Sequence, residues 1–383
     1  SACYNSPHIH EYNERISVLD SSRKTRLSSD QELCDAFTAI ETGRNGIPLT
    51  YFEFGTLAAL WQIKQWQVDV ALLEVGLGGR LDAVNIVEPD LAIVTSVGLD
   101  HQDWLGDTLD LIGYEKAGIA RKGKPLICGQ PNVSQGFIDQ ANVLQAKTYY
   151  QGIDFVVKQQ ADSLLLDYPS SASSAVSSKV SSKVAGLKAD SAVETIRLPK
   201  GHIPHLNIAS AIAGLNAINL LPKTEGIIRA VENTKVAGRL TSYDCEYRGK
   251  RITFTLDVAH NPQAAQYLAA QIKATDTAIL AMLVDKEPLA VVQALGQIQY
   301  WHFAGLNGYR GQTSQQLADK VGLTTDQFEM HSDVAHAIQN ILQSKRFEQG
   351  KITAPIFIIG SFLTVSAAEQ ALKTIEGLSI HGN

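Results

Sequence analysis

Hydrophobic and polar positions in the first half of the chain follow two patterns in turn. From Thr50 to Gln65 apolar residues recur at helical spacing, and Glu53 stands three positions after Thr50, as in a capping box, so we expect a helix there. Apolar runs follow at 68–75 and 91–99. Runs of this kind are typical of strands buried on both faces of a parallel sheet.

The alternation continues along the chain. We expect a helix over 107–123, a strand over 124–130 and an amphipathic helix from His205. A second pattern of strands and helices opens near residue 251, with further apolar runs starting near residues 277, 298 and 354. Strands that alternate with helices predict an α/β fold with parallel, doubly wound sheets.

The pattern also suggests a division of the chain. Because the second α/β pattern opens shortly after Gly238, we expect an N-terminal domain of residues 1–238 and a smaller C-terminal domain of residues 239–383. Residues 170–182 include eight serines, and the tandem SSKVSSKV follows within the same region. We expect an exposed, mobile insertion over about 169–192.

Composition excludes several classes of protein. The 383 residues carry 33 basic and 39 acidic side chains, a net charge of -6, which argues against a nucleic-acid-binding protein. No apolar run reaches the length of a membrane span, so no membrane partner is expected. The four cysteines are far apart and form no C-x-x-C pair, which suits a reducing cytoplasm.

Residues that could bind a ligand follow the first two predicted strands. Open α/β sheets bind ligands at the carboxyl ends of their strands. After Glu74 the chain turns through Gly76, Gly78 and Gly79 and then presents Arg80. The turn is not a dinucleotide fingerprint, since the third glycine position holds a leucine. Either a ligand-binding loop or a plain tight turn would explain these glycines.

Asp100 and His101 follow the next strand, and they lie beside Glu74 if the two strands are neighbours. Glu74, His101 and the Ser6 hydroxyl would then be candidates to share a divalent cation such as Mg²⁺. A packed or capping histidine is the alternative for His101, and a solvated helix position is the alternative for Lys116.

The second half has its own polar residues at strand ends. Asp257 and His260 follow a buried strand, and Pro262 is placed to begin a helix. Capping is an alternative role for Asp257 and for Asn261. Two loop cations, Lys286 and Arg310, are consistent with phosphate contacts.

Together these segments resemble one family. They are, in order, YNSPHIHEYNERI, TYFEFGTLAAL, the long block from Leu72 to Ala120, AGRL, LDVAHNPQAA, AMLVDKE and GSFLTV. They occur in this order in folylpolyglutamate synthase and in its bifunctional form with dihydrofolate synthase, which belong to the Mur-ligase-like amide ligases. The resemblance covers nearly the whole chain.

The resemblance implies an N-terminal Mur-ligase-like ATPase domain with a parallel sheet, truncated at its N-terminus, and a Rossmann-like C-terminal domain that ligates glutamate. It implies a monomeric, cytoplasmic enzyme that uses ATP and magnesium, with two ions expected. The γ-phosphate of ATP would activate the carboxylate of dihydropteroate or a reduced folate as an acyl phosphate, and the amine of L-glutamate would displace the phosphate.

The resemblance also assigns roles to individual residues. The magnesium ligands would be Ser6, Glu74, His101 and a carbamylated Lys116, and the last three would be catalytic. ATP would be held by Asn207, Arg239 and Asp257. The pterin substrate would be held by Thr50, Tyr51, Phe52, Glu53, Leu81, Asp82 and Ala83.

One departure from the family concerns its P-loop, a Gly-Lys-Gly-[Ser/Thr] motif that precedes the segment at Ser6. In this sequence Gly-Lys occurs at 123–124, 249–250 and 350–351. These pairs are followed by Pro125, Arg251 and Ile352, and not by the residues that complete the motif. We expect that the sequence is truncated, and that these residues alone turn over no ATP. A peptidoglycan-precursor Mur ligase and a non-catalytic pterin-binding remnant are the alternatives.

Overall fold

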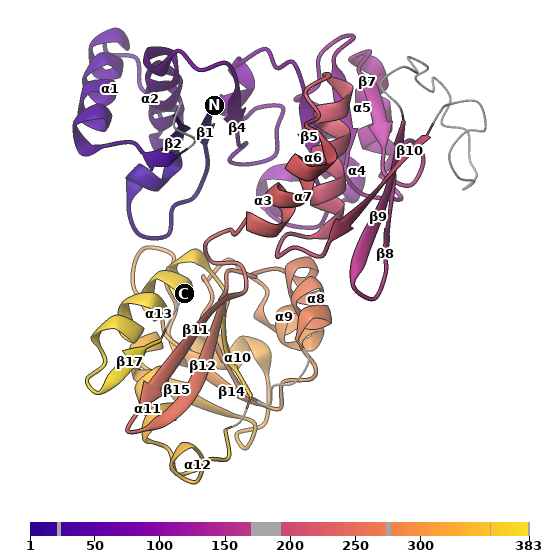
Figure 1. The fold of residues 1–383 in the computed structure, drawn as a ribbon. Helices are drawn as coiled ribbons and strands as arrows, with labels where there is room; N and C mark the ends of the chain where they lie inside the picture. Colours follow the sequence, from indigo (N-terminus) through magenta and orange to yellow (C-terminus); the bar gives the residue numbers. More distant parts are fainter. Residues whose placement is uncertain (21–23, 170–192, 273–276, 353, 382–383) are drawn as a thin grey trace. The chain divides into compact units, whose positions relative to one another are not determined.

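The chain forms two compact units, Ser1–Lys235 and Val236–Asn383, in the computed structural model (Figure 1). The described residues are 1–20, 24–169, 193–272, 277–352 and 354–381. Apart from Pro169, the insertion predicted over about 169–192 therefore lies outside the described residues. Each unit has its own hydrophobic core.

The first sheet of unit 1 has the order β3-β2-β1-β4. Its strands are β1 (Ala2–Tyr4), β2 (Ile16–Leu19), β3 (Thr25–Leu27) and β4 (Ala71–Leu73). β1 runs parallel to β4 and antiparallel to β2. The helices α1 (Asp30–Gly43) and α2 (Tyr51–Trp66) accompany it, and α2 begins at the predicted capping box, with Thr50 and Glu53 in reciprocal hydrogen bonds.

The prediction that 68–75 is a strand buried on both faces is wrong. Only Ala71–Leu73 is strand, and the side chain of Leu72 is 54% exposed. In the described sheet β4 is an edge strand that pairs with β1. Tyr4 and Leu73 pack with Ala59 of α2 on one face, whereas Leu72 points to the other face.

The second sheet of unit 1 is parallel, with the order β5-β6-β7. It contains β5 (Ala92–Val94), β6 (Pro125–Cys128) and β7 (Lys147–Tyr150). Helices α4 (Leu109–Ala117) and α5 (Gln135–Val143) pack in one core cluster, and α6 (His205–Ala217) and α7 (Thr224–Asn233) pack in another. An antiparallel sheet of β8 (Val156–Gln159), β9 (Ser163–Pro169) and β10 (Val193–Pro199) completes the unit.

The predicted strands and helices of this region are present, but they are shorter than predicted. The expected strand 91–99 ends at Val94, and the expected helix 107–123 ends at Ala117. β4 and β5 also belong to different sheets, so they are not the hydrogen-bonded neighbours that the analysis of Glu74 and His101 supposed. Sequence periodicity identifies strands but does not say which strands pair.

Unit 2 is built on a seven-stranded sheet with the order β15-β14-β13-β16-β12-β11-β17 (Figure 1). Its parallel strands are β12 (Lys250–Asp257), β13 (Thr277–Leu280), β14 (Tyr300–Ala304), β15 (Phe328–His331) and β16 (Ile356–Ile359). β11 (Thr241–Tyr247) and β17 (Leu378–Ile380) add an antiparallel edge. The four strands predicted for this half are confirmed.

Helices cover the sheet of unit 2 on both faces, as doubly wound folds require. α8 (Pro262–Gln271), α9 (Pro288–Ala294) and α10 (Ser314–Val321) pack with Trp301 and Phe303 in one core cluster. On the other face, α11 (Val334–Gln343) contacts β13, β14 and β15, and α13 (Phe362–Thr374) contacts β12 and β16. The short helix α12 (Lys345–Glu348) follows α11.

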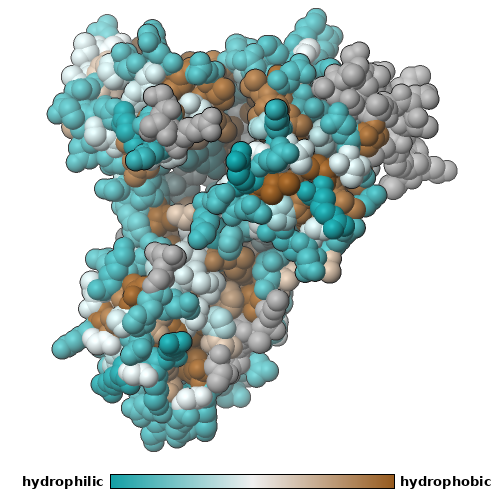
Figure 2. Space-filling view, in the orientation of Figure 1, coloured by the Kyte–Doolittle hydropathy of each residue, from teal (hydrophilic) through white to brown (hydrophobic). Residues whose placement is uncertain are grey.

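Among the described residues, no helix combines the length and the apolar character needed to cross a membrane. On the face of the molecule shown in Figure 2, hydrophobic residues form patches among hydrophilic ones.

The glycine turn after β4 packs closely against two helices. Gly76 faces the ring of Phe52 in α2, where an added Cβ would lie 2.4 Å from the ring. Gly79 faces α4, where an added Cβ would lie 2.8 Å from the carbonyl oxygen of Glu115. The backbone N–H of Arg80 donates to the same oxygen at 2.8 Å. A side chain at Gly76 or Gly79 would therefore push the turn away from its helix.

We expect Gly79→Ala to lower the free energy of unfolding of unit 1 by about 1–3 kcal/mol, because the added methyl group meets the backbone of α4. Hydrogen exchange of α4 amides, read by mass spectrometry, measures the loss locally. Gly43→Ala at the end of α1 is the matched control, since no atom lies within 4 Å of the added Cβ. Equal effects of the two substitutions would contradict the packing argument.

The carboxylate of Glu32 joins three elements of unit 1. It accepts hydrogen bonds from both terminal nitrogens of Arg26 in β3, from the Ser29 N–H that begins α1, and from the Trp66 indole at the end of α2. The Arg26 guanidinium is the main cause that lowers the pKa of Glu32 to about 2.

The Glu32 contacts predict acid sensitivity. A carboxyl whose folded pKa lies below its unfolded value stabilises the fold above the unfolded pKa, and this contribution is lost as the pH falls through the folded pKa. Urea denaturation of Glu32→Gln should therefore show reduced stability at pH 7 and convergence with wild type as the pH falls from about 4.5 towards 2.

Glu41→Gln is the control for this experiment. Glu41 also pairs with an arginine, Arg44, at 2.7 Å on the same helix, but its side chain is 59% exposed. Exposed ion pairs contribute little to stability, so we expect Glu41→Gln to change the stability much less than Glu32→Gln does. A Glu32→Gln protein as stable as Glu41→Gln at pH 7 would contradict the interpretation.

Candidate functional site

Ser6 and Glu74 lie together because they follow paired parallel strands. β1 and β4 end at the same edge, and the Glu74 N–H donates to the Tyr4 carbonyl at 2.9 Å. The backbone N–H of Ser6 donates to Oε2 of Glu74 at 2.8 Å. Two of the four predicted metal ligands are thus adjacent, and they offer a carboxylate and a hydroxyl, the oxygen ligands that magnesium prefers.

Asp100, His101 and Lys116 form a second group. His101 has a left-handed backbone (φ 53°) and precedes the short helix α3 (Gln102–Leu105), but its side chain makes no capping hydrogen bond. Its Nε2 lies 3.8 Å from Oδ1 of Asp100. A capping role for the His101 side chain is therefore excluded, and the ring remains partly exposed.

Lys116 is half-buried on α4 rather than solvated. Burial lowers its pKa, because a low-polarity environment disfavours the charged amine, and the negative charge of Asp100 opposes this effect. A lowered pKa increases the fraction of neutral amine, which is the form that reacts with carbon dioxide.

The glycine turn begins just after Glu74 and packs against α4, the helix that carries Lys116. Arg80 at the end of the turn donates from Nη2 to Oε1 of Glu115 at 2.8 Å and stacks its guanidinium over Tyr114. Glu115 and Lys116 are consecutive residues of α4. The turn therefore holds the helix of Lys116 by an ion pair as well as by close backbone packing.

The two predicted substrate segments, Thr50–Glu53 and Leu81–Ala83, meet at Gly76. Phe52 packs over Gly76, and Oδ2 of Asp82 accepts a hydrogen bond from the Gly76 N–H at 3.1 Å. Thr50, Glu53 and Asp82 also cap helix ends, whereas Tyr51 and Leu81 are exposed. Ala83 begins a short 3₁₀ helix, Ala83–Ile86. The structure thus gives several of these side chains a structural role, and their role in substrate binding stays a prediction.

Arg15 is a residue that the sequence analysis did not single out. It is buried, and its guanidinium lies 5.2 Å from the ring centroid of Tyr12 and 5.6 Å from that of Tyr51. Its Nε donates to Nδ1 of His8 at 2.9 Å. The available sequence signal was its position within YNSPHIHEYNERI. In the structure Arg15 is a buried cation beside the exposed ring of Tyr51, an arrangement that suits an anionic aromatic ligand.

In unit 2, Asp257 is held at the end of β12. Its two oxygens accept hydrogen bonds from the N–H groups of Leu240 (3.0 Å) and Ala259 (2.8 Å), and Arg239 lies 3.7 Å away. Burial raises the pKa of Asp257, against the opposing effect of Arg239. The structure brings Arg239 and Asp257 together as one group.

The remaining predicted residues have local positions. Asn207 lies in the first turn of α6. Asn261 caps α8 and Pro262 is its first residue, as predicted. His260 bonds to the Val258 carbonyl, and Arg310 pairs with Asp285.

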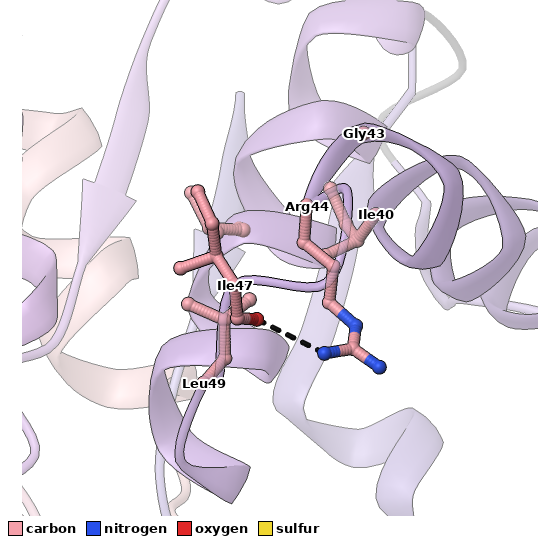
Figure 3. A pocket seen from close by; sticks show the side chains of 6 residues that line it. Ile40, Gly43, Arg44, Ile47 and Leu49 are labelled. Atoms are coloured by element: carbon pink, nitrogen blue, oxygen red, sulfur yellow. Dashed lines mark hydrogen bonds between the residues drawn. The ribbon is translucent and has the colours of Figure 1, made fainter.

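A separate apolar pocket lies between the end of α1 and the start of α2 (Figure 3). It is lined by Ile40, Gly43, Arg44, Ile47, Leu49 and Leu57. Arg44 donates to the Ile47 carbonyl at 2.9 Å and pairs with Glu41. The lining contains none of the predicted site residues, so the pocket does not add to the candidate site.

Known proteins resemble this chain along almost its whole length. Residues 238–353 match the family described as "Mur ligase, glutamate ligase domain". The dihydrofolate synthase/folylpolyglutamate synthase of Escherichia coli is 35% identical over 380 residues, which are 96% of this chain and 79% of that protein.

Solved structures give the same result. E. coli FolC in complex with DHPP and ADP matches with a TM-score of 0.79 and 32% identity, over 97% of this chain and 81% of that one. A bifunctional folylpolyglutamate synthase/dihydrofolate synthase with Mn, AMPPNP and L-glutamate bound matches with a TM-score of 0.78 and 34% identity, over 97% and 82%. This chain therefore belongs to the dihydrofolate synthase/folylpolyglutamate synthase family.

Proposed function

We propose that the protein is an ATP-dependent amide ligase that joins L-glutamate to dihydropteroate, to a reduced folate, or to both. The observation that carries this proposal is the 35% identity over 96% of the chain to a dihydrofolate synthase/folylpolyglutamate synthase. A carboxylate is a poor electrophile, so ATP would first phosphorylate it. The glutamate amine would then displace phosphate and form the amide.

A divalent cation fits the donor set described above. Ser6, Glu74, His101 and Lys116 would hold it, and two ions are proposed. The Mn and AMPPNP bound in a related structure support a divalent cation, as do the oxygen donors of Ser6 and Glu74. When bound, the cation supplies charge that stabilises the phosphoryl group during transfer.

We propose that Lys116 is carbamylated. Carbamylation joins carbon dioxide to the neutral amine with loss of a proton, and the product is an anionic oxygen ligand. The half-buried position and lowered pKa of Lys116 favour the reactive form. Unmodified, the lysine would place a cation next to the proposed metal.

We assign the other predicted residues to the binding of the pterin, ATP and glutamate. Residues 1–238 would bind the pterin through 50–53 and 81–83, and Asn207 would contact ATP. Residues 239–383 would form the glutamate-ligating domain, with Arg239 and Asp257 at the nucleotide. Arg15 would add a cation beside Tyr51. We further propose a cytoplasmic monomer with small-molecule substrates, which the four free cysteines fit.

Product formation tests the proposed reaction. With the protein as its gene encodes it, ADP and phosphate should form together with a glutamyl product only when ATP, Mg²⁺, glutamate and a pterin carboxylate are all present. The assay is a coupled measurement of ADP with mass spectrometry of the product. Dihydropteroate and tetrahydrofolate, supplied separately, distinguish the two activities. Glutamyl product without ATP would disprove the mechanism, and turnover of a muramyl nucleotide instead would assign a peptidoglycan ligase.

Two substitutions test the site. Glu74→Gln and Lys116→Ala should each lower kcat at least about hundredfold, because each removes a proposed metal ligand. Lys122→Ala is the matched control for Lys116, since Lys122 is an exposed lysine nearby. Near-normal turnover of either site variant would overturn the assignment.

Added acetate tests carbamylation separately from ligation. It should restore part of the activity of Lys116→Ala, because a small carboxylate can replace the lost ligand. If Lys116→Ala is inactive and acetate has no effect, the carbamylation proposal fails while the ligase proposal stands.

A further inference from the structure

Two histidines and a glutamate meet at one edge of the unit 2 sheet. His302 lies on β14, and Glu329 and His331 lie on the edge strand β15. His302 pairs in register with Glu329, and His331 is two residues further along its strand, so the three side chains share one face of the sheet. The neighbours of His302, Trp301 and Phe303, belong to the core cluster of the opposite face.

The three ligand atoms form a compact triangle. Nδ1 of His302 lies 2.9 Å from Nε2 of His331, and Oε2 of Glu329 lies 3.8 Å and 3.9 Å from these two nitrogens. A point equidistant from the three atoms is about 2.1 Å from each, which matches zinc–nitrogen and zinc–oxygen distances of about 2.0–2.2 Å. The two nitrogens share a hydrogen bond in this structure, so a metal ion would take the place of that hydrogen bond, and the three ligand atoms already lie within 4.8 Å of one another.

The surroundings prepare these groups to bind a metal. Both imidazoles are buried, and a buried site disfavours the charged form of the ring. Neutral imidazole is the form that coordinates metals. The Tyr300 hydroxyl donates to the other oxygen of Glu329 at 3.2 Å and so helps to fix the carboxylate.

Of the charged groups near the cluster, one opposes the binding of a cation and one favours it. Arg346 of α12 is close enough to lower the pKa of His302, and its positive charge opposes a cation. Glu329 supplies the opposing negative charge. His336 of α11 lies beside His331, with ring centroids 6.2 Å apart, and its Nδ1 contacts the Ser332 hydroxyl.

We propose that His302, Glu329 and His331 bind a zinc ion that ties the edge strand β15 to β14. Imidazole and carboxylate donors suit zinc better than magnesium, whose preferred ligands are oxygens. The site lies within unit 2 and shares no residue with the proposed magnesium ligands in unit 1. Three protein ligands leave a fourth position for water.

Metal titration tests the site. The full chain, stripped of metal with a chelator, is titrated with Zn²⁺ by calorimetry and with Co²⁺, whose visible absorption reports its ligands. With excess Mg²⁺ present to occupy the proposed unit 1 site, we expect about one zinc ion per chain that is lost with the triad, and a higher Tm of unit 2 with zinc, since a ligand that binds the folded state stabilises it. Glu329→Gln and His331→Gln should each weaken binding more than about tenfold.

Two features of the chain provide controls. Glu329 is exposed, so Glu329→Gln removes one ligand while leaving the core intact, even if a change at buried His331 impairs folding. His381 lies 3.6 Å from Glu246 at the other edge of the sheet, and His381→Gln should leave zinc binding unchanged. The proposal is overturned if wild type takes up no stoichiometric zinc, or if Glu329→Gln binds zinc as tightly as wild type does.

Discussion

The close packing of the glycine turn on α4 is the contact on which the candidate site depends. Glu74 stands at the end of a strand in one small sheet, whereas Lys116 belongs to a helix that packs on another. The turn after Glu74 joins the two through the Gly79 backbone and the Arg80–Glu115 ion pair. It also contacts Phe52 on its other side. The turn that follows the first sheet is thereby fixed to the helix of the second.

Much of the local structure could be predicted from the sequence because it follows from short-range chemistry. The capping box of Thr50 and Glu53, the cap of Asn261 and the strands of unit 2 all depend on residues close together in the chain. The exposure of Leu72 could not be predicted in this way, since it depends on which strand lies at a sheet edge. The partial burial of Lys116 depends likewise on tertiary packing around α4.

The site residues show the same limit. The strand-end positions and the family resemblance both singled out Ser6 and Glu74, but their contact follows from the parallel pairing of β1 and β4, which periodicity does not reveal. The cluster of His302, Glu329 and His331 was missed altogether, because its members come from two strands and form no short motif. Burial shifts Lys116 and Asp257 towards their neutral forms, and such shifts are typical of functional sites.

The strand order of unit 2 has a consequence for synthesis on the ribosome. β16 lies between β12 and β13, so these earlier strands do not touch each other across a hydrogen-bonded ladder. Until residues 356–359 emerge from the exit tunnel, the nascent chain holds a β11–β12 hairpin and a β13–β14–β15 layer as separate pieces with open edges. Late insertion of this central strand joins the two pieces before β17 adds the last edge strand, and until then the open strand edges favour misassociation.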